Sequence, residues 1–349
     1  MRTALAVLGL ACGLTACRAF DESLLDGGGA DAGSSCMPRT PPERPMPVPT
    51  PGDMELLFAL RDVRLEQGGD WRAIGYDLDG LCSVDPSPQV ECHPPDEMNG
   101  LATDGTDGID NAAGDNVFPF TLVLLGDLEA PVRQDEEMGR GVILLRLRGY
   151  NGEPDDDRVN VAIAMAAFGS PALPSGDPPE LPPDGSAPPP PAWDGTDYWW
   201  GETAAFLGGD IEMPLVDDSS AYVSGSTLVV HPPDRSPLVF TAAGFSFELK
   251  LAGAVITAQI TDGGTRLSPV TVAGRWRLLD IRETFPSFGL CPSSVNAGRM
   301  SRLLDQSADV RAGAPGATCD AISVGIELTG YGGRMAGVAA GPAPPVACP

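Results

Sequence analysis

The chain has 349 residues, with 48 acidic against 22 basic side chains and a formal net charge of −26 at pH 7. This balance argues against nucleic acids and anionic lipid surfaces as partners, because both would repel the chain. The length is sufficient for one large β domain or for two smaller domains, each with an apolar core.

Residues 1–16 have the features of a secretory signal: a basic start, an apolar run too short for an ordinary transmembrane helix, and small residues at the end. The Leu-Thr-Ala-Cys sequence at 14–17 resembles the lipobox of bacterial lipoproteins. This resemblance implies cleavage before Cys17, palmitate-type acylation of that cysteine and anchoring to the cell envelope. Arg18, in place of aspartate, implies sorting to the outer membrane. A weaker lipobox candidate is Cys12, preceded by Gly9-Leu10-Ala11. The other alternative is an ordinary secretory signal with an incidental cysteine.

Residues 17–52 are predicted to be a flexible tether, because they are rich in glycine and proline and contain no apolar pattern. A second proline-rich stretch at 170–192 is expected to be a surface loop or a linker. It separates a β-rich first half, 53–169, from a β-rich second half, 193–349.

Most of the body has the residue pattern of β-strands. The segment 116–128 is ambiguous, because it suits either a buried strand or a helix with Pro119 in its first turn. A helix is predicted near 294–310, with Ser294 as its N-cap. The Asn-Gly pair between 140–152 and 156–168 indicates a hairpin. The predicted strands are 54–67, 71–80, 140–152, 156–168, 221–232, 237–242, 245–261, 270–285 and 321–331.

Many short strands with Gly and Pro turns predict a mainly β protein. The expected form is an antiparallel β-sandwich or jelly-roll-like body, with one C-terminal covering helix and long loops. The pattern leaves open whether the two halves form one sandwich or two.

Six cysteines remain after the signal and Cys17, and an even number in an exported chain indicates disulfide bonds. Zinc is not expected, because there is no CxxC motif and the two histidines lie far apart. Nearest neighbours in sequence suggest two pairs, and the third pair would join the start of the body to its end. The expected pairs are Cys82–Cys92, Cys291–Cys319 and Cys36–Cys348.

The acidic stretch "DGTDGIDNAAGDN" at 104–116 is the candidate metal site, together with "YDLDG" at 76–80. Calcium prefers six to eight oxygen ligands, which carboxylates and amides supply. No Lys or Arg occurs between Arg72 and Arg133, whereas twelve Asp or Glu do. The alternative is a solvated Asx-turn loop without an ion. The candidate ligands are Asp77, Asp79, Asp104, Asp107, Asp110, Asn111 and Asp115.

These motifs resemble the calcium loops of thrombospondin type 3 repeats and the DGxDN signature of myxobacterial surface proteins. The resemblance covers only about 40 residues. It departs from the type 3 pattern in the long spacing between Asp79 and Asp104, and in the lack of a cysteine after Asn111. What it implies is a calcium-stabilised acidic loop.

A second candidate site is "WDGTDYWW" at 193–200, where exposed aromatic rings would suit sugar stacking. The alternative is that these aromatic side chains fill the core. The residues concerned are Trp193, Tyr198, Trp199 and Trp200.

Enzyme motifs are absent: there is no GxSxG, no HExxH, and no P-loop lysine. The sequence therefore predicts a non-enzymatic lipoprotein with a structural or binding role and a glycan or protein partner of unknown identity. The alternative is a carbohydrate-binding or carbohydrate-active surface module.

Overall fold

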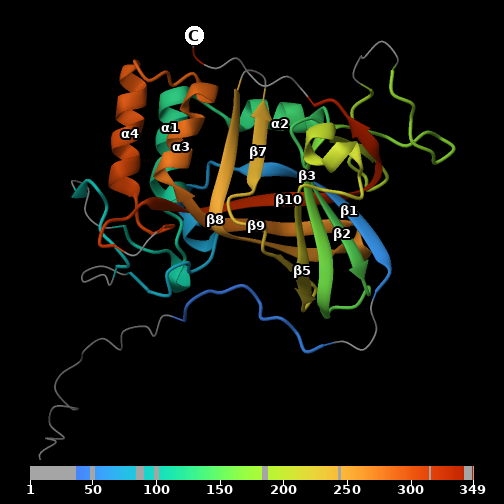
Figure 1. Ribbon diagram of the computed structural model, residues 1–349, viewed down its shortest axis with the longest axis horizontal. Coiled ribbons are helices and arrows are strands. Elements are labelled where there is room, and N and C mark those ends of the chain that lie inside the picture. The colour runs from blue at the N-terminus through green and yellow to red at the C-terminus, as the bar shows by residue number, and fades with distance from the viewer. Residues whose placement is uncertain are drawn as a thin grey trace, which may run out of the picture. The chain divides into compact units, whose positions relative to one another are not determined.

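The sheet of the molecule is closed, because its first strand pairs with its last. β1 (Met54–Arg64) pairs antiparallel with β2 (Ile143–Tyr150) on one side and with β10 (Ala321–Ala339) on the other. The strands between them follow chain order, and eight strands form an up-and-down antiparallel barrel (Figure 1). The other strands of this barrel are β3 (Asp156–Ser170), β5 (Val216–Ser224), β6 (Thr227–Val230), β8 (Phe245–Thr261) and β9 (Arg266–Arg277).

The predicted sandwich or jelly roll is therefore wrong, although the mainly β class is confirmed. A sandwich needs two sheets with free edges, whereas here the pairing of β1 with β10 joins the two edges into one wall. The strands of the first predicted half continue into those of the second with no break in the wall, since β3 pairs with β5 across the proline-rich loop. The two halves consequently share a single barrel.

This computed structural model describes residues 37–47, 52–83, 90–97, 102–182, 188–242, 245–313, 316–341 and 348. The predicted signal, Cys17 and the glycine-rich part of the tether lie outside these residues. Residues 38–349 form one compact unit.

Part of the proline-rich segment lies against the body. The N–H of Arg39 donates to the carbonyl of Asp107 (2.8 Å), and the guanidinium of Arg44 stacks over the ring of Tyr222 at 4.5 Å. The hydroxyl of Tyr222 donates to the carbonyl of Pro42 (2.6 Å). The segment 37–47 is thus fastened to the barrel by side-chain and backbone contacts.

The two pairings of β4 (Tyr198–Glu202) close a second, smaller ring beside the barrel. β4 pairs antiparallel with the end of β3 and parallel with the end of β10. Since β1 and β2 already connect β10 to β3, the strands β10, β1, β2, β3 and β4 form a closed circuit. β1 and β2 therefore belong to both rings.

Both faces of β1 are buried because each faces a different ring. Phe58 and Leu60 belong to the large core inside the barrel, whereas Leu57 and Ala59 pack with Trp199 in the small ring. Trp199 has no exposed surface, and it fits because Gly169 carries no side chain: a Cβ there would lie 2.5 Å from the indole ring. Because successive side chains of a strand point to opposite faces, alternate residues of β1 are buried in two different cores.

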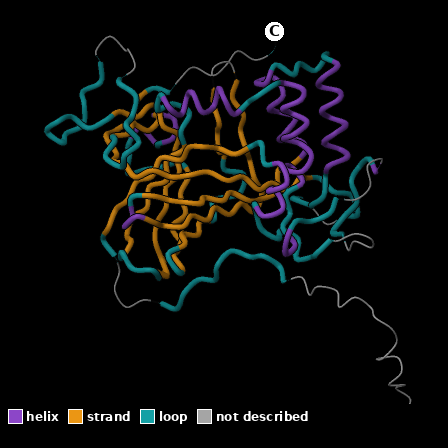
Figure 2. Tube along the Cα trace, turned by 180° about the vertical axis from the view of Figure 1, so that it is seen from behind, coloured by secondary structure: helices purple, strands orange, loops and turns teal. Residues whose placement is uncertain are grey.

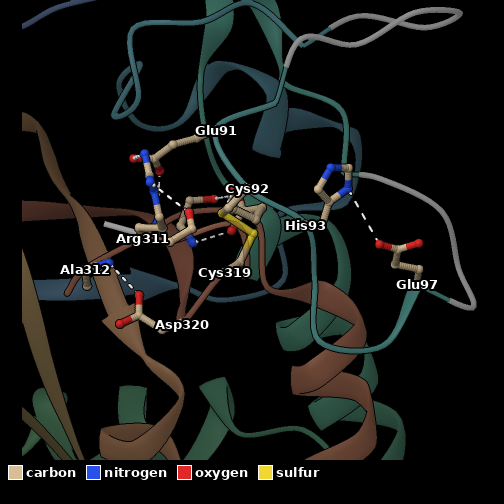
Figure 3. The surroundings of a disulfide bond; sticks show 11 residues. Glu91, Cys92, His93, Glu97, Arg311, Ala312, Cys319 and Asp320 are labelled. Atoms are coloured by element: carbon tan, nitrogen blue, oxygen red, sulfur yellow. Dashed lines mark hydrogen bonds and ion pairs between the residues drawn. A yellow bond between two sulfur atoms is a disulfide. The ribbon is translucent and has the colours of Figure 1, made fainter. Parts of the chain in front are cut away.

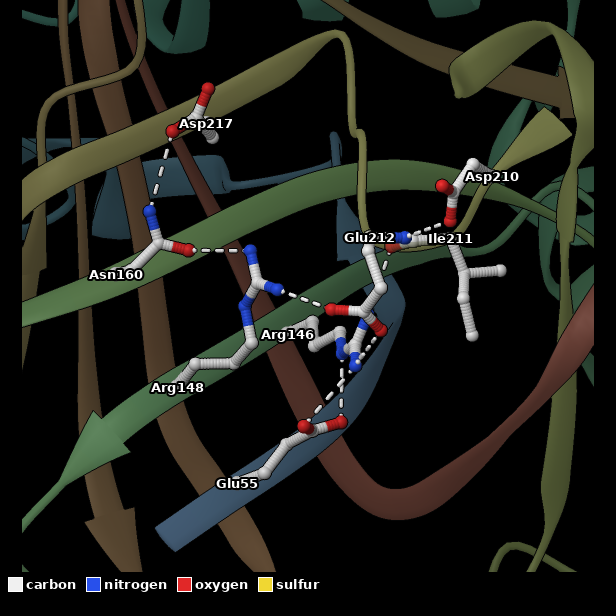
Figure 4. Close-up of polar contacts among 8 residues, drawn as sticks. All are labelled: Glu55, Arg146, Arg148, Asn160, Asp210, Ile211, Glu212 and Asp217. Atoms are coloured by element: carbon white, nitrogen blue, oxygen red, sulfur yellow. Dashed lines mark hydrogen bonds and ion pairs between the residues drawn. The ribbon is translucent and has the colours of Figure 1, made fainter. Parts of the chain in front are cut away.

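A polar network lies on the small-ring face of β2. Arg146 donates to Glu55 (2.7 Å) and to Glu212 (2.8 Å), and Arg148 pairs with the same Glu212 carboxylate at 2.7 Å (Figure 4). Arg146 is almost fully buried, so these ion pairs satisfy a guanidinium that would otherwise be costly to desolvate. They tie the loop 210–212 to β1 and β2.

Helices cover the barrel (Figures 1 and 2). The predicted helix near 294–310 is confirmed, including the cap: the Ser294 hydroxyl accepts from the N–H of Ala297. The ambiguous segment 116–128 is a helix with Pro119 in its first turn. The strand predicted at 71–80 is instead a 3₁₀ turn, Gly68–Ala73, followed by loop. The α-helices are α1 (Phe118–Leu125), α2 (Glu129–Glu137), α3 (Leu278–Thr284) and α4 (Val295–Ser307). Of these, α1, α3 and α4 stand side by side (Figures 1 and 2).

Some described elements were not predicted separately. The expected strand 270–285 divides into β9 and α3, and 221–232 is the hairpin of β5 and β6. The predicted strands 237–242 and 245–261 match β7 (Pro237–Ala242) and β8. Among the described residues, no helix is long and apolar enough to cross a membrane.

Two glutamates of α2 hold the irregular end of β1. Asp62 has a positive φ of 59°, and the β1–β10 register shifts between Arg61 and Arg64. The freed Asp62 N–H donates to Oε2 of Glu136 (2.9 Å), and Oε1 of Glu129 accepts from two further backbone N–H groups. Glu136 is only 2% exposed. Burial, with repulsion from Asp62, raises the pKa of Glu136 from its usual 4.5 to about 7.

We expect the stability of Glu136→Gln relative to the wild type to rise by about 2 kcal/mol between pH 5 and pH 8. A raised folded-state pKa means that Glu136 supports the fold fully below about pH 4.5 and loses that contribution as pH rises through about 7. Glutamine keeps an acceptor for the Asp62 N–H but cannot ionise. Urea unfolding of both proteins from pH 5 to 8 measures the difference. A constant difference across this range would contradict the assignment.

Candidate metal centre

The candidate carboxylates come from two loop segments that run side by side. The N–H of Asp110 donates to the carbonyl of Tyr76 (3.0 Å), and the N–H of Asp104 donates to the carbonyl of Ser83 (3.0 Å). These two bonds align 76–83 with 104–110, although the segments are separated in sequence. The alignment places the "YDLDG" aspartates opposite the acidic stretch.

Three carboxylates meet at this junction. One side-chain oxygen from each of Asp77, Asp79 and Asp110 lies within 4.8 Å of the others. Asp110 is 3% exposed, and Oδ2 of Asp77 is fully buried without a hydrogen-bond partner. An oxygen set of this kind is typical of a hard divalent cation.

A cavity of about 10 Å³ lies beside the three carboxylates. Asp79, Asp104, Asp110 and Asp309 are among its lining residues. The volume is about that of one water-sized guest. Four acidic side chains thus border a space that fits a single ion or water.

The electrostatics of the cluster are unfavourable without a cation. Burial, followed by repulsion from Asp309 and Asp79, raises the pKa of Asp110 to about 9. Burial and the neighbouring carboxylates likewise raise the pKa of Asp104 to about 6. A bound divalent ion would reverse these effects by favouring the charged carboxylates.

The Asx-turn alternative accounts for some of the oxygens. Oδ1 of Asp77 accepts from the N–H of Gly80 (2.6 Å), and Oδ1 of Asp79 accepts from the N–H of Leu81 (2.8 Å). These bonds fix the turn and leave the second oxygen of each carboxylate for other partners. The turn is therefore compatible with either interpretation.

Three predicted ligands do not join the cluster. Asp107 is exposed with a positive φ of 55°. Asp115 is exposed, and its carboxylate accepts from the side chain of Asn116 (3.2 Å). Asn111 is buried, and its amide is fully occupied by the protein. The side chain of Asn111 donates to Gln67 Oε1, Trp71 O and Ile74 O, and accepts from the N–H groups of Gly114 and Gly325.

Sequence reasoning missed residues that approach the cluster from the end of the chain. Asp309 borders the cavity, and its carboxylate accepts from the N–H (2.8 Å) and the hydroxyl of Ser323. Arg275 of β9 donates to the carbonyl of Leu78 and lowers the pKa of Asp77 and Asp79 electrostatically, against the larger effect of burial. No local pattern marks these residues, because they lie about 200 positions away. The segment 73–132, which contains no Lys or Arg, is thus contacted by a basic side chain from the barrel, Arg275.

The disulfide bonds differ from the predicted pairs. Cys92 is bonded to Cys319, and Cys291 to Cys348, so all three expected pairings are wrong. Cys82 is also disulfide-bonded. Proximity in sequence failed as a guide, because the loop before β10 pairs with a segment that lies between "YDLDG" and the acidic stretch.

The Cys92–Cys319 bond lies within this pairing (Figure 3). The N–H of His93 donates to the carbonyl of Ala317 (2.8 Å), and the N–H of Cys319 donates to the carbonyl of His93 (2.8 Å). Arg311 pairs with Glu91 at 3.1 Å on the same side. Since Cys92 also lines the acidic cavity, the disulfide fixes one wall of the candidate site to the start of β10.

The aromatic side chains at 193–200 are largely buried. Trp199 is 0%, Trp200 5% and Tyr198 9% exposed, and Trp193 is partly buried against Trp199 with ring centroids 5.0 Å apart. Arg61 stacks over Trp193 at 4.5 Å. Trp199 and Trp193 therefore pack in the small ring of strands, and the four aromatic side chains do not form an open platform for a sugar.

No protein-family model matches the chain, and no curated protein or solved structure matches it either. The functional argument accordingly depends on the residues of this chain alone.

Proposed function

We propose that the protein is a lipid-anchored barrel of the bacterial cell envelope, exported and with a structural or binding role, and braced by a calcium ion. The observation that carries the calcium assignment is the convergence of Asp77, Asp79 and Asp110 next to an ion-sized acidic cavity. Asp104 completes the proposed ligand set. Calcium suits these ligands, since they are all oxygens and their number leaves positions for water or backbone carbonyls.

The proposed role of the ion is to support the fold. The cluster lies in loops beneath the barrel strands and contains no histidine or thiol that would indicate a catalytic metal. A cation here offsets carboxylate repulsion and joins the segments 76–83 and 104–110. No observation favours the carbohydrate alternative, because its aromatic residues are largely buried.

We expect millimolar calcium to raise the melting temperature of the full chain by about 5 °C relative to chelator at pH 8, because the ion binds only the folded state. Asp110→Asn should abolish this shift, since it removes the most buried ligand. Asp107→Asn is the matched control: it lies in the same loop but outside the cluster, and it should keep the shift. Differential scanning calorimetry with calcium and with chelator measures both.

An unchanged melting temperature of the wild type at millimolar calcium would disprove the proposal that the protein binds calcium. A shift that survives in Asp110→Asn would place the ion elsewhere.

The anchor has a separate test, since Cys17 lies outside the described residues. We expect Cys17→Ser to move the protein from the membrane fraction to the soluble fraction of the cell, because acyl chains supply the membrane affinity. Immunoblotting of the two fractions measures this, with Cys12→Ser as the control that stays membrane-bound. Retention of Cys17→Ser in the membrane would disprove the anchor.

A further inference from the structure

The barrel wall is incompletely paired along β5. Only Tyr222–Ser224 of this strand pair with β6, whereas its first part, from Val216, pairs with β3 alone among the described strands. β7 begins on the other side of this gap, at Pro237. The wall is therefore interrupted between the start of β5 and the start of β7.

A cavity of about 480 Å³ occupies this interruption. Its deepest lining is apolar and buried: Ile143 is 2%, Ile163 4% and Leu238 3% exposed. Its volume and its apolar floor are typical of a small-molecule site. The cavity reaches the side chains that also form the barrel core.

The rim of the cavity exposes apolar side chains to solvent. Leu215 lines the cavity and is 58% exposed, and Leu207 and Met213 of the same loop are 56% and 47% exposed. The N–H of Leu207 donates to the carbonyl of Met213 (2.8 Å), which holds the loop in a fixed turn. An apolar rim at the mouth of an apolar cavity favours an apolar guest.

The polar groups of the cavity carry a net negative charge. Glu202, at the end of β4, is partly buried, and its carboxylate makes no hydrogen bond or ion pair with any described residue; burial raises its pKa. Asp234 is a second lining carboxylate. Arg235, the one cation among the described lining residues, is already neutralised by the buried Asp280 at 2.6 Å. Within the part of the chain that the structure describes, Glu202 is thus a carboxylate without a counter-ion at the edge of an apolar space.

We propose that this cavity binds a small aliphatic molecule that carries a protonated amine. The aliphatic part lies on the floor formed by Ile143, Ile163 and Leu238, and the ammonium group pairs with Glu202. A ligand carboxylate would instead meet Glu202 and Asp234 and be repelled. The site is separate from the acidic cluster, so the two proposals stand or fail independently.

The test is isothermal titration calorimetry of the full chain with decylammonium, decanol and decanoate. We expect one decylammonium to bind per chain, more tightly than decanol, with decanoate weakest. Glu202→Gln should weaken decylammonium binding by about tenfold, the worth of one charge-assisted contact, and leave decanol unchanged. Ala204→Trp, at the exposed rim, should block both ligands by filling the entrance.

Glu180→Gln is the matched control, since it removes one exposed acidic charge away from the cavity and should change nothing. Several outcomes would overturn the proposal: no binding of decylammonium at millimolar concentration, decanoate binding as tightly as decylammonium, or equal effects of Glu202→Gln and Glu180→Gln. The last result would show that the amine is attracted only by the net charge of the chain.

Discussion

Replacing both Cys92 and Cys319 by alanine is expected to lower the free energy of unfolding by about 4 kcal/mol. The bond joins residues 227 positions apart, so its loss frees a very long loop in the unfolded chain. It also releases the segment that lines the acidic cavity. Urea unfolding under non-reducing conditions measures the loss.

The second disulfide is the internal control. Cys291 and Cys348 are only 57 positions apart, so removal of this pair should cost about 1 kcal/mol less. A loss below 1 kcal/mol for the Cys92/Cys319 variant would show that the backbone pairing of His93 with the loop before β10 holds this region without the bond.

Replacing Asn111 by aspartate is expected to destabilise the fold by about 4 kcal/mol, even in the presence of calcium. At a metal-ligand position aspartate would be tolerated or would strengthen binding. Here the amide donates to Gln67, Trp71 and Ile74, and a carboxylate cannot donate. The substitution leaves three acceptors facing a buried negative charge. Chemical unfolding with and without calcium measures the effect.

Asn116→Asp is the matched control, because it makes the same change in a partly exposed side chain five residues away. It should cost less than 1 kcal/mol. If calcium rescued Asn111→Asp to wild-type stability, the position would be a metal ligand after all.

The environment of Asn111 explains why its role could not be predicted from sequence. Asn111 bridges the turn at 67–74 to Gly325 of β10, whose N–H donates to its Oδ1 at 2.8 Å. Gly325 is required for this approach, since a Cβ there would lie 2.1 Å from the carbonyl of Ile74. In the sequence, an asparagine in an acidic, glycine-rich stretch has the same appearance whether it binds calcium or the backbone.

Patterns of short range were reliable indicators of the fold. The alternation of 245–261, the Asn-Gly turn before β3 and the Ser294 cap of α4 each concern residues within one element or one hairpin. The strand predicted at 71–80 failed, because Trp71 belongs to a 3₁₀ turn and Tyr76 lies in a loop. Tyr76 packs its ring against side chains of the barrel strands and forms no strand pairing with them.

Features set by distant pairing were not accessible in this way. Barrel closure depends on Leu57–Arg64 meeting the middle of β10, and the acidic cavity depends on Asp309. Asp77, Asp79 and Asp110, three of the predicted ligands, do lie close together in the structure. The sequence could not separate them from Asp107 and Asp115, which only the folded loop turns outward.

The pairing of β1 with β10 also sets the order in which the molecule can be assembled. During synthesis β1 emerges early, and one of its edges stays without its partner until almost the whole chain has been made. The same delay applies to the small ring, because β10 supplies a wall of both rings. A chain that ends before Ala321 has open edges at β1 and β9, and open edges are the sites where strands of different molecules associate. Completion of the last strand is therefore the step that converts an aggregation-prone sheet into two closed cores.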